Sequence, residues 1–193
     1  MGLTLLVGTL AIQVVLPAMR WSTRSQSRGQ LQESCYAALQ NVRAELQLTN
    51  AAAISLTNSS SPGAPVVLAF QPLLQDLPSA RPTYLAELTA ICWDPSAGTL
   101  VRKSWSTDPL GVGLDTVSPS RLKDVQLLSL RTLATSDSKM LAQYVEDFSV
   151  TSGTARPNIG NPLKLHLTLK RQVAAGEPDQ STLDSVVYLR NAP

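Results

Sequence analysis

An uncharged apolar segment at the amino terminus limits most strongly what this chain can fold into. Residues 1–19 read MGLTLLVGTLAIQVVLPAM and contain no acidic or basic side chain. A segment of this length can cross the hydrocarbon core of a bilayer, or can form half of a long helix that packs against copies of itself. The residues after it are soluble in character, so we expect a membrane-inserted stalk that carries an exported head.

The apolar segment continues into an amphipathic stretch, and together they predict one helix from about Leu3 to Asn50. Pro17 should kink this helix or loosen one turn, because proline removes a backbone donor and clashes with the preceding turn. In the second half, apolar residues recur at helical spacing on one face, which predicts that this face packs on the head. These residues are Leu31, Cys35, Leu39, Val42 and Leu46.

After the helix the hydrophobic pattern alternates, which predicts antiparallel strands and hairpins. A long helix followed by such strands predicts an α+β fold in which the helix packs on an antiparallel sheet. We divide the chain into an apolar helix (1–21), an amphipathic half of the same helix (22–50) and a β-rich head (51–193). The expected strands are 53–56, 66–70, 84–93, 99–105, 145–151, 163–170 and 185–190, with a helical turn at 138–145 and a helix or strand at 121–133.

The charge of the chain gives no case for nucleic-acid binding. The formal net charge is +2, whereas a nucleic-acid reader needs a clustered basic face. Arg20, Arg24 and Arg28 are four residues apart and share one face of the helix. We interpret this stripe as a face turned to membrane headgroups or to solvent.

The two cysteines, Cys35 and Cys92, form no CxxC motif and no Cys/His cluster, so the sequence predicts no metal site. In an exported head a disulfide is allowed, and this one would link the helix to a strand. The alternative is two buried cysteines that pack as small apolar side chains. The spacing of the cysteines is compatible with both a disulfide and two buried thiols.

No pattern in the chain indicates an enzyme. The only histidine, His166, shares the polar face of an expected strand with Lys164 and Thr168, which is typical of a surface histidine. No nucleophile elbow, P-loop or dinucleotide-binding glycine motif is present, so we expect no catalytic residue and no cofactor. Glu87, Asp94 and Asp147 are scattered along the chain.

Three segments occur in an order and spacing typical of one known family. They are GLTLL at 2–6, ICWDPSAGTLVR at 91–102 and VVYLRN at 186–191. The first resembles a prepilin motif, the second a strand that turns into Gly-x-Leu-x-Arg, and the third a closing strand that ends Leu-Arg-Asn. In this order they resemble the type IV pilin-like family, and within it the J-type minor pseudopilins of type II secretion and related minor type IV pilins.

The resemblance implies a pilin-like fold and a subunit that is located first in the inner membrane and then in a filament. Prepilin peptidase would cut after Gly2, and Leu3 would become the first mature residue, often N-methylated. The helix would span the bacterial inner membrane once, with a periplasmic head, and would then pack into a filament with sibling minor pilins or pseudopilins and the major pilin. The side chains expected in the membrane or filament core are Leu5, Leu6, Val7, Leu10, Ile12, Val14, Val15, Leu16 and Pro17.

Two features depart from the family pattern. Val7 takes the place of the fifth mature residue, which is usually a glutamate that compensates the amino-terminal charge of a neighbouring subunit. A subunit at the filament tip has no subunit ahead of it, so Val7 suggests a tip or initiator role. Only Met1 precedes Gly2, whereas leaders of the family are longer and basic, which would fit an upstream start or a truncated chain.

A second function stays open beside the first. The chain could be a signal-anchored periplasmic binding module that recognises a peptide, an exoprotein or DNA, with uncharged loops such as 109–119 in that role. The residues do not distinguish a secretion system from a pilus or a DNA-uptake apparatus.

Overall fold

The computed structural model describes residues 2–57, 63–75, 82–119, 121–153, 159–173 and 178–190. Within the first helix, side chains are described at positions 13 and 15 and from position 17 onward. The sequence also predicts turns at 58–63 and 174–180 and a loop at 72–82, and these segments lie partly outside the described residues.

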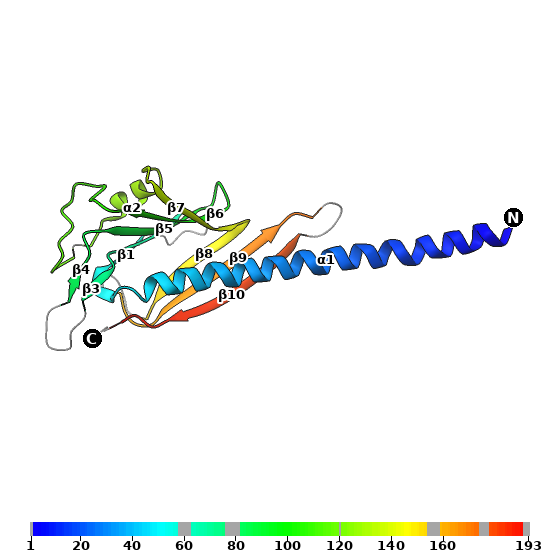
Figure 1. The fold of residues 1–193 in the computed structure, drawn as a ribbon, viewed down its shortest axis with the longest axis horizontal. Helices are drawn as coiled ribbons and strands as arrows, with labels where there is room; N and C mark the ends of the chain where they lie inside the picture. Colours follow the sequence, from blue (N-terminus) through cyan, green and yellow to red (C-terminus); the bar gives the residue numbers. More distant parts are fainter. Residues whose placement is uncertain are drawn as a thin grey trace.

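One helix, α1 (Gly2–Leu46), accounts for the stalk. At 1.5 Å per residue its 45 residues extend about 68 Å. Its carboxy-terminal half lies along the head, and its amino-terminal half projects beyond it (Figure 1). The helix continues through Pro17 and ends at Leu46, so the predicted helix is confirmed with a slightly earlier end. Among the described residues, no helix combines the length and hydropathy that a membrane span requires.

Asn50 turns the chain from the helix into the head. Its side-chain oxygen accepts hydrogen bonds from the backbone N–H groups of Ala52 and Ala53, which starts a short 3₁₀ helix, η1 (Ala51–Ala53). The hydroxyl of Tyr84 donates to the same oxygen at 2.9 Å. Asn50 thus caps η1, four residues after α1 ends at Leu46.

The strands of the head form three antiparallel sheets in the described part of the chain. The sheet orders are β1-β2-β5-β6-β7, β10-β9-β8 and β3-β4. A second helix, α2 (Asp124–Leu130), precedes β7. The strands are β1 (Ile54–Leu56), β2 (Val66–Phe70), β3 (Leu73–Gln75), β4 (Thr83–Tyr84), β5 (Leu88–Asp94), β6 (Thr99–Trp105), β7 (Asp137–Gln143), β8 (Val145–Ser152), β9 (Leu163–Arg171) and β10 (Asp179–Val187).

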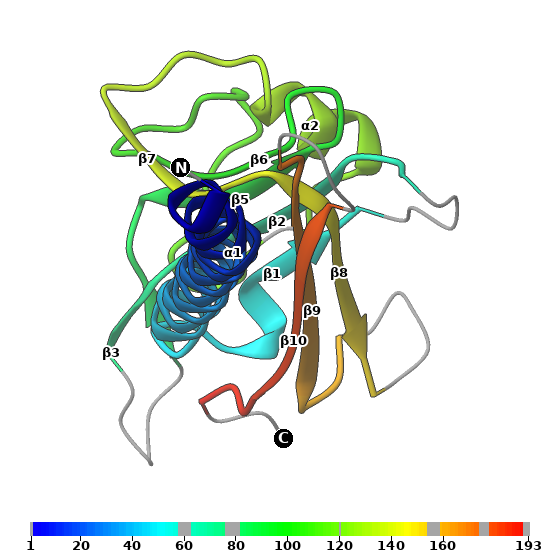
Figure 2. The ribbon, with the colours of Figure 1, turned by 90° about the vertical axis from the view of Figure 1, so that its right-hand side faces the viewer.

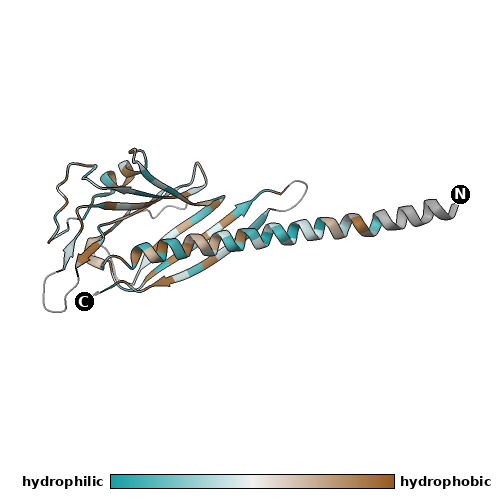
Figure 3. Ribbon diagram, in the orientation of Figure 1, coloured by the Kyte–Doolittle hydropathy of each residue, from teal (hydrophilic) through white to brown (hydrophobic). Residues whose placement is uncertain are grey.

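The main core lies where α1 meets the two larger sheets. In Figure 2 the helix lies in the angle between β9 and β10 on one side and the five-stranded sheet on the other. Where α1 runs beside the head, its hydrophobic and hydrophilic residues alternate (Figure 3). The predicted packing face is confirmed, because all five of its residues are buried in this core. They are Leu31, Cys35, Leu39, Val42 and Leu46, and they meet Leu163, Leu165, Leu167 and Leu169 of β9 and Ile91, Trp93 and Leu100 of the five-stranded sheet.

The opposite face of the five-stranded sheet carries a second core under α2. Cys92 and Trp105 are buried there with Leu127 and Leu130 of the helix. The ammonium group of Lys103 donates to the carbonyl oxygens of residues 130, 131 and 133, at distances of 3.4, 2.5 and 2.9 Å. A cation at this end of α2 is favourable, because the last carbonyl groups of a helix are electronegative and unpaired.

Tyr144 is the corner at which the chain passes from one sheet to the other. It is the single residue between β7 and β8, and its φ of 61° lies in the left-handed region that side chains other than glycine rarely adopt. The N–H of Lys170 donates to the carbonyl of Tyr144 at 2.8 Å. The turn that faces this corner contains Gly98, whose φ of 60° favours glycine for the same reason.

The α+β class is confirmed, as are the hairpin of expected strands 53–56 and 66–70 and that of 84–93 and 99–105. Three element predictions need correction. Residues 138–145 are not helical, because this segment pairs with β6 as strand β7. The strand expected at 84–93 is divided into β4 and β5, since β4 pairs with β3 in a separate small sheet. The last strand begins at Asp179 rather than Ser185, because it pairs with β9 along its full length.

Candidate functional site

A buried carboxylate joins the stalk to the head. Asp179, at the start of β10, is 0 % exposed, and its Oδ1 lies 3.3 Å from Nε of Arg24 and 3.2 Å from Nε of Arg28. Burial raises the pKa of Asp179, but the Ser27 hydroxyl and the two guanidinium groups outweigh it, so the pKa lies below its ordinary value. The Arg24 and Arg28 side chains are 40 % and 57 % exposed, as a solvent face requires, but they also pair with the head, which the interpretation of the arginine stripe did not include.

A second ion-pair network fixes the end of α1. Arg102 of β6 lies between two carboxylates: its Nε is 2.7 Å from Oε1 of Glu45 on α1, and its Nη1 is 2.8 Å from Oδ2 of Asp137 on β7. Burial lowers the pKa of Arg102, but the two carboxylates outweigh it and raise the pKa above its ordinary value. Arg102 of β6 thus links α1 to β7.

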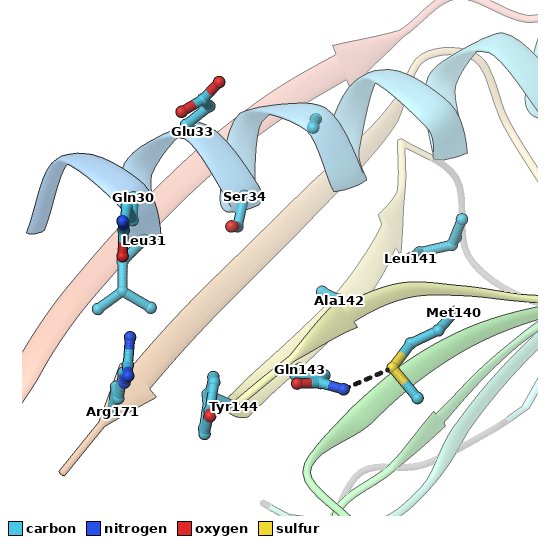
Figure 4. A pocket seen from close by; sticks show the side chains of 11 residues that line it. Gln30, Leu31, Glu33, Ser34, Met140, Leu141, Ala142, Gln143, Tyr144 and Arg171 are labelled. Carbon is cyan, nitrogen blue, oxygen red and sulfur yellow. Dashed lines mark hydrogen bonds between the residues drawn. The ribbon is translucent and has the colours of Figure 1, made fainter. Parts of the chain in front are cut away.

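A groove runs between α1 and β7, with a volume of about 540 Å³. Gln30, Glu33 and Ser34 line it from the helix, as Figure 4 shows, and β7 with its corner lines it from the other side. Leu31, Leu141 and Ala142 give it an apolar floor. In the described part of the chain β7 pairs with β6 alone, so it is an edge strand.

An arginine closes one end of this groove. The guanidinium of Arg171, at the end of β9, lies 5.5 Å from the centre of the Tyr144 ring, as expected for a cation–π contact. A smaller hollow of about 270 Å³ continues past Arg171 along α1, between Thr23 and Gln30. The groove could not be predicted from the sequence, because residues 138–145 were expected to form a helical turn, whereas most of them belong to strand β7.

The two cysteines do not form the possible disulfide. Both are free thiols and both are buried. Cys35 lies in the core beneath α1, whereas Cys92 lies in the core on the other face of the five-stranded sheet. Burial raises the pKa of Cys35, and it raises that of Cys92 to about 11. The two thiols therefore act as small apolar side chains in separate cores.

His166 sits in a polar cluster on the outer face of the three-stranded sheet. Its Nδ1 lies 2.7 Å from Oδ1 of Asp184, and its Nε2 lies 3.3 Å from the hydroxyl of Thr168 and 3.7 Å from Oδ2 of Asp147. The sequence of contacts resembles a catalytic triad, but the Thr168 hydroxyl also bonds Thr182 across the strands at 3.0 Å. The contacts connect Asp147 of β8 with β9 and with Thr182 and Asp184 of β10, so they form a cross-strand network.

Asp94 is held by contacts with Ser96 and Arg131. The Ser96 hydroxyl, 2.6 Å from Oδ1 of Asp94, lowers the pKa of Asp94 to about 2, and Arg131 at 2.9 Å adds to this against the effect of burial. Within the described ranges, no three potential ligands are arranged to hold a metal ion. Val15 and Pro17 are exposed on the projecting helix. Side chains of the remaining stalk residues lie outside the described ones: Gly2, Leu3, Leu5, Leu6, Val7, Leu10, Ile12, Val14 and Leu16.

Comparison with known proteins adds no identity to this geometry. No family model, no curated protein and no solved structure matches the chain. The groove combines apolar and charged lining residues beside strand β7, and the two ion-pair networks attach α1 to the head. These features, with the projecting helix, are the basis on which a function is assigned.

Proposed function

We propose that this chain is a minor pilin or pseudopilin, a structural subunit that primes a type IV pilus or a type II secretion pseudopilus or sits near its tip. The observation that carries the proposal is α1, a single helix that packs on the head over its second half and projects from it over its first half, in which residues 2–19 are uncharged (Figure 1). A stalk of this kind can wait in the inner membrane and then pack with the helices of sibling subunits and of the major pilin.

The hairpin shared with the resembled family supports the proposal. In the Gly-x-Leu-x-Arg segment, Gly98 adopts a positive φ in the turn, Leu100 is buried against α1, and Arg102 pairs with Glu45 of α1. Each residue of the motif thus contributes to the turn or to the attachment of the helix. Such attachment is required of a head that must stay fixed to its stalk during assembly.

The tip position follows from the proposed processing. Cleavage by prepilin peptidase after Gly2 would place Val7 at the fifth mature position, without a carboxylate. A subunit that follows another needs this acid to balance the amino-terminal charge of its neighbour in an apolar core, because an unpaired buried charge is costly. A subunit at the tip has no subunit ahead of it and does not need this acid.

The mass and the amino terminus of the native, membrane-extracted protein test this proposal. We expect a mature chain that begins at Leu3 and carries one methyl group on its amino nitrogen. An intact Met1, or cleavage after Pro17, would exclude the pilin assignment.

The groove beside β7 favours a second candidate, a signal-anchored periplasmic binding module for a peptide, an exoprotein or DNA. The two candidates differ in their loss-of-function effect. Deleting a minor pilin abolishes or strongly reduces filament assembly, whereas deleting a binding module leaves filaments intact and removes only ligand capture.

A further inference from the structure

We propose that the arginine face of α1, defined by Arg20, Arg24 and Arg28, binds the headgroups of anionic phospholipids where the helix leaves the membrane. This inference rests on the proposed function, in which residues 2–19 lie in the inner membrane, and it names a lipid partner for the segment between the membrane and the head. The three arginines are four residues apart, so they share one face of the helix.

Positive charge is in excess in this segment. Residues 20–32 contain three arginines and no acidic residue, and the first acidic residue of α1 is Glu33. The head contributes the carboxylate of Asp179, whose Oδ1 is shared by Arg24 and Arg28. Arg20, about one turn closer to the amino terminus, is exposed. Three guanidinium groups around one carboxylate are complementary in charge to the phosphate of an anionic lipid.

The two arginines that bind Asp179 remain accessible to a second anion. The Arg24 and Arg28 side chains are 40 % and 57 % exposed. A guanidinium group carries five N–H donors in a planar fork, so it can bind a carboxylate on one side and a phosphate on another. A hollow of about 490 Å³ lies along this face of the helix, and it is lined by Trp21, Arg24, Ser25, Arg28, Gly29 and Gln32.

Trp21 favours a lipid over a soluble phosphate as the partner. Its side chain is 75 % exposed, and it lies between the uncharged residues 2–19 and the two arginines that bind the head. Tryptophan is enriched at the interface of membrane and water, where its ring lies at the level of the headgroups. A soluble phosphate would contact the arginines alone, whereas a lipid would also contact the indole ring.

The lengths of the two segments fit the layers of a bilayer. Residues 2–19 extend about 27 Å along the helix axis, against about 30 Å of hydrocarbon. Arg20 and Arg28 are about 12 Å apart along the same axis. The headgroup region is about 5–8 Å thick on each side, and the field of an anionic surface extends about a further 8 Å, so it covers all three arginines.

Quenching of tryptophan fluorescence by brominated lipids tests this assignment. The chain has three tryptophans, and Trp93 and Trp105 are only 1 % and 8 % exposed, so Trp21 reports lipid contact. The full-length chain in micelles of an uncharged detergent is titrated with brominated phosphatidylglycerol or with brominated phosphatidylcholine. We expect half-maximal quenching by phosphatidylglycerol at a mole fraction roughly tenfold lower than by phosphatidylcholine. Trp21→Phe should abolish the quenching.

A matched pair of variants tests the role of the arginines. Arg20→Gln removes one charge outside the Asp179 junction, and it should raise the mole fraction of phosphatidylglycerol at half-maximal quenching about fivefold, as expected for one arginine near an anionic surface. Arg43→Gln is the same change at an exposed arginine of α1 beside the head, and it should raise this fraction less than about twofold. Circular dichroism confirms that the variants fold.

Three results would overturn the lipid site. They are equal quenching by the two lipids, a preference that Arg20→Gln leaves unchanged, and displacement of phosphatidylglycerol by inorganic phosphate at equal concentration. If one of them is found although the native chain begins at Leu3, the lipid site fails and the pilin proposal stands. A native chain that keeps Met1 removes the pilin proposal, and a preference for phosphatidylglycerol that Arg20→Gln weakens would still establish the lipid site.

Discussion

At the scale of single residues, the attachment of α1 depends on a narrow apolar stripe. Leu46 is 0 % exposed at the end of this stripe, whereas Leu48, two residues later, is 50 % exposed. Truncation of a buried leucine removes its transfer free energy and leaves a cavity, and together these cost about 2–5 kcal/mol. We therefore expect Leu46→Ala to lower the free energy of unfolding by about this amount.

Urea denaturation of the two variants side by side measures the effect. Leu48→Ala should change the free energy of unfolding by no more than about 0.5 kcal/mol, as is usual for surface substitutions. Equal losses for Leu46→Ala and Leu48→Ala would show that the end of α1 is not packed in the core.

The two thiols should be unreactive in the native protein. Burial raises the pKa of Cys92 to about 11, so at pH 8 roughly one molecule in a thousand carries the reactive thiolate there. Burial also raises the pKa of Cys35. We expect no alkylation by iodoacetamide in the native chain, two alkylations after unfolding in urea without reductant, and no effect of dithiothreitol on the melting temperature. One disulfide in the unreduced, unfolded chain would contradict this prediction.

The apolar stripe of α1 could be predicted from the sequence and the Asp179 cluster could not. Residues four positions apart on a helix share a face, so Leu31, Cys35 and Leu39 could be placed without knowledge of the fold. Asp179 and Arg28 are 151 positions apart. Their contact depends on how β10 is placed beside α1, and no local pattern in the chain carries that information.

At the scale of elements, β7 shows where tertiary pairing overrides local preference. Its sequence, DSKMLAQ, is rich in lysine, methionine, leucine, alanine and glutamine, which favour helices. Six of its residues nevertheless pair with β6, and this pairing decides the conformation. The hairpin of β5 and β6 was predictable, because its turn residues and both strands lie within one short segment. The groove depends on β7 and so could not be foreseen.

The junction of α1 and β10 should depend on pH. The pKa of Asp179 is lowered in the folded state, so its contribution to stability is present above the unfolded pKa of about 3.9 and is lost as the pH falls through the folded value. Asp179→Asn should therefore be less stable than the native chain at pH 7, and the difference should shrink as the pH falls below about 4.

Urea midpoints of both proteins between pH 7 and the acid limit check this expectation. Glu33→Gln serves as the control, because Glu33 is exposed and makes no ion pair with a described residue, and its midpoint should follow that of the native chain. A gap between Asp179→Asn and the native chain that stays constant with pH would mean that the carboxylate charge does not hold the junction. Asp94, with a pKa of about 2, should add acid sensitivity equally to all three proteins.

At the scale of the whole molecule, the chain separates two tasks along one helix. The second half of α1 fills the angle between two sheets and is fixed by Asp179 at one end and by Arg102 at the other. The first half projects from the head (Figure 1). The division into an apolar helix, an amphipathic helix and a β-rich head could be read from the change in hydrophobic period. The division of the head into two larger sheets could not, since it depends on the turn of the chain at Tyr144.

The projecting half of α1 should not tolerate a charge if it is buried in a membrane or in a filament core. A carboxylate near the centre of an inserted helix costs about 3 kcal/mol on insertion scales, which corresponds to a loss of more than a hundredfold in the inserted fraction relative to the uninserted one. Leu10→Asp should therefore remove the chain from the membrane fraction and from filaments.

Leu74→Asp, a matched change at an exposed leucine of the head, should leave both distributions unchanged. Sedimentation after carbonate extraction measures the first distribution, and immunodetection in sheared filaments the second. Normal membrane extraction and assembly of Leu10→Asp would mean that this half of α1 remains in contact with water, and the proposed stalk would have to be abandoned.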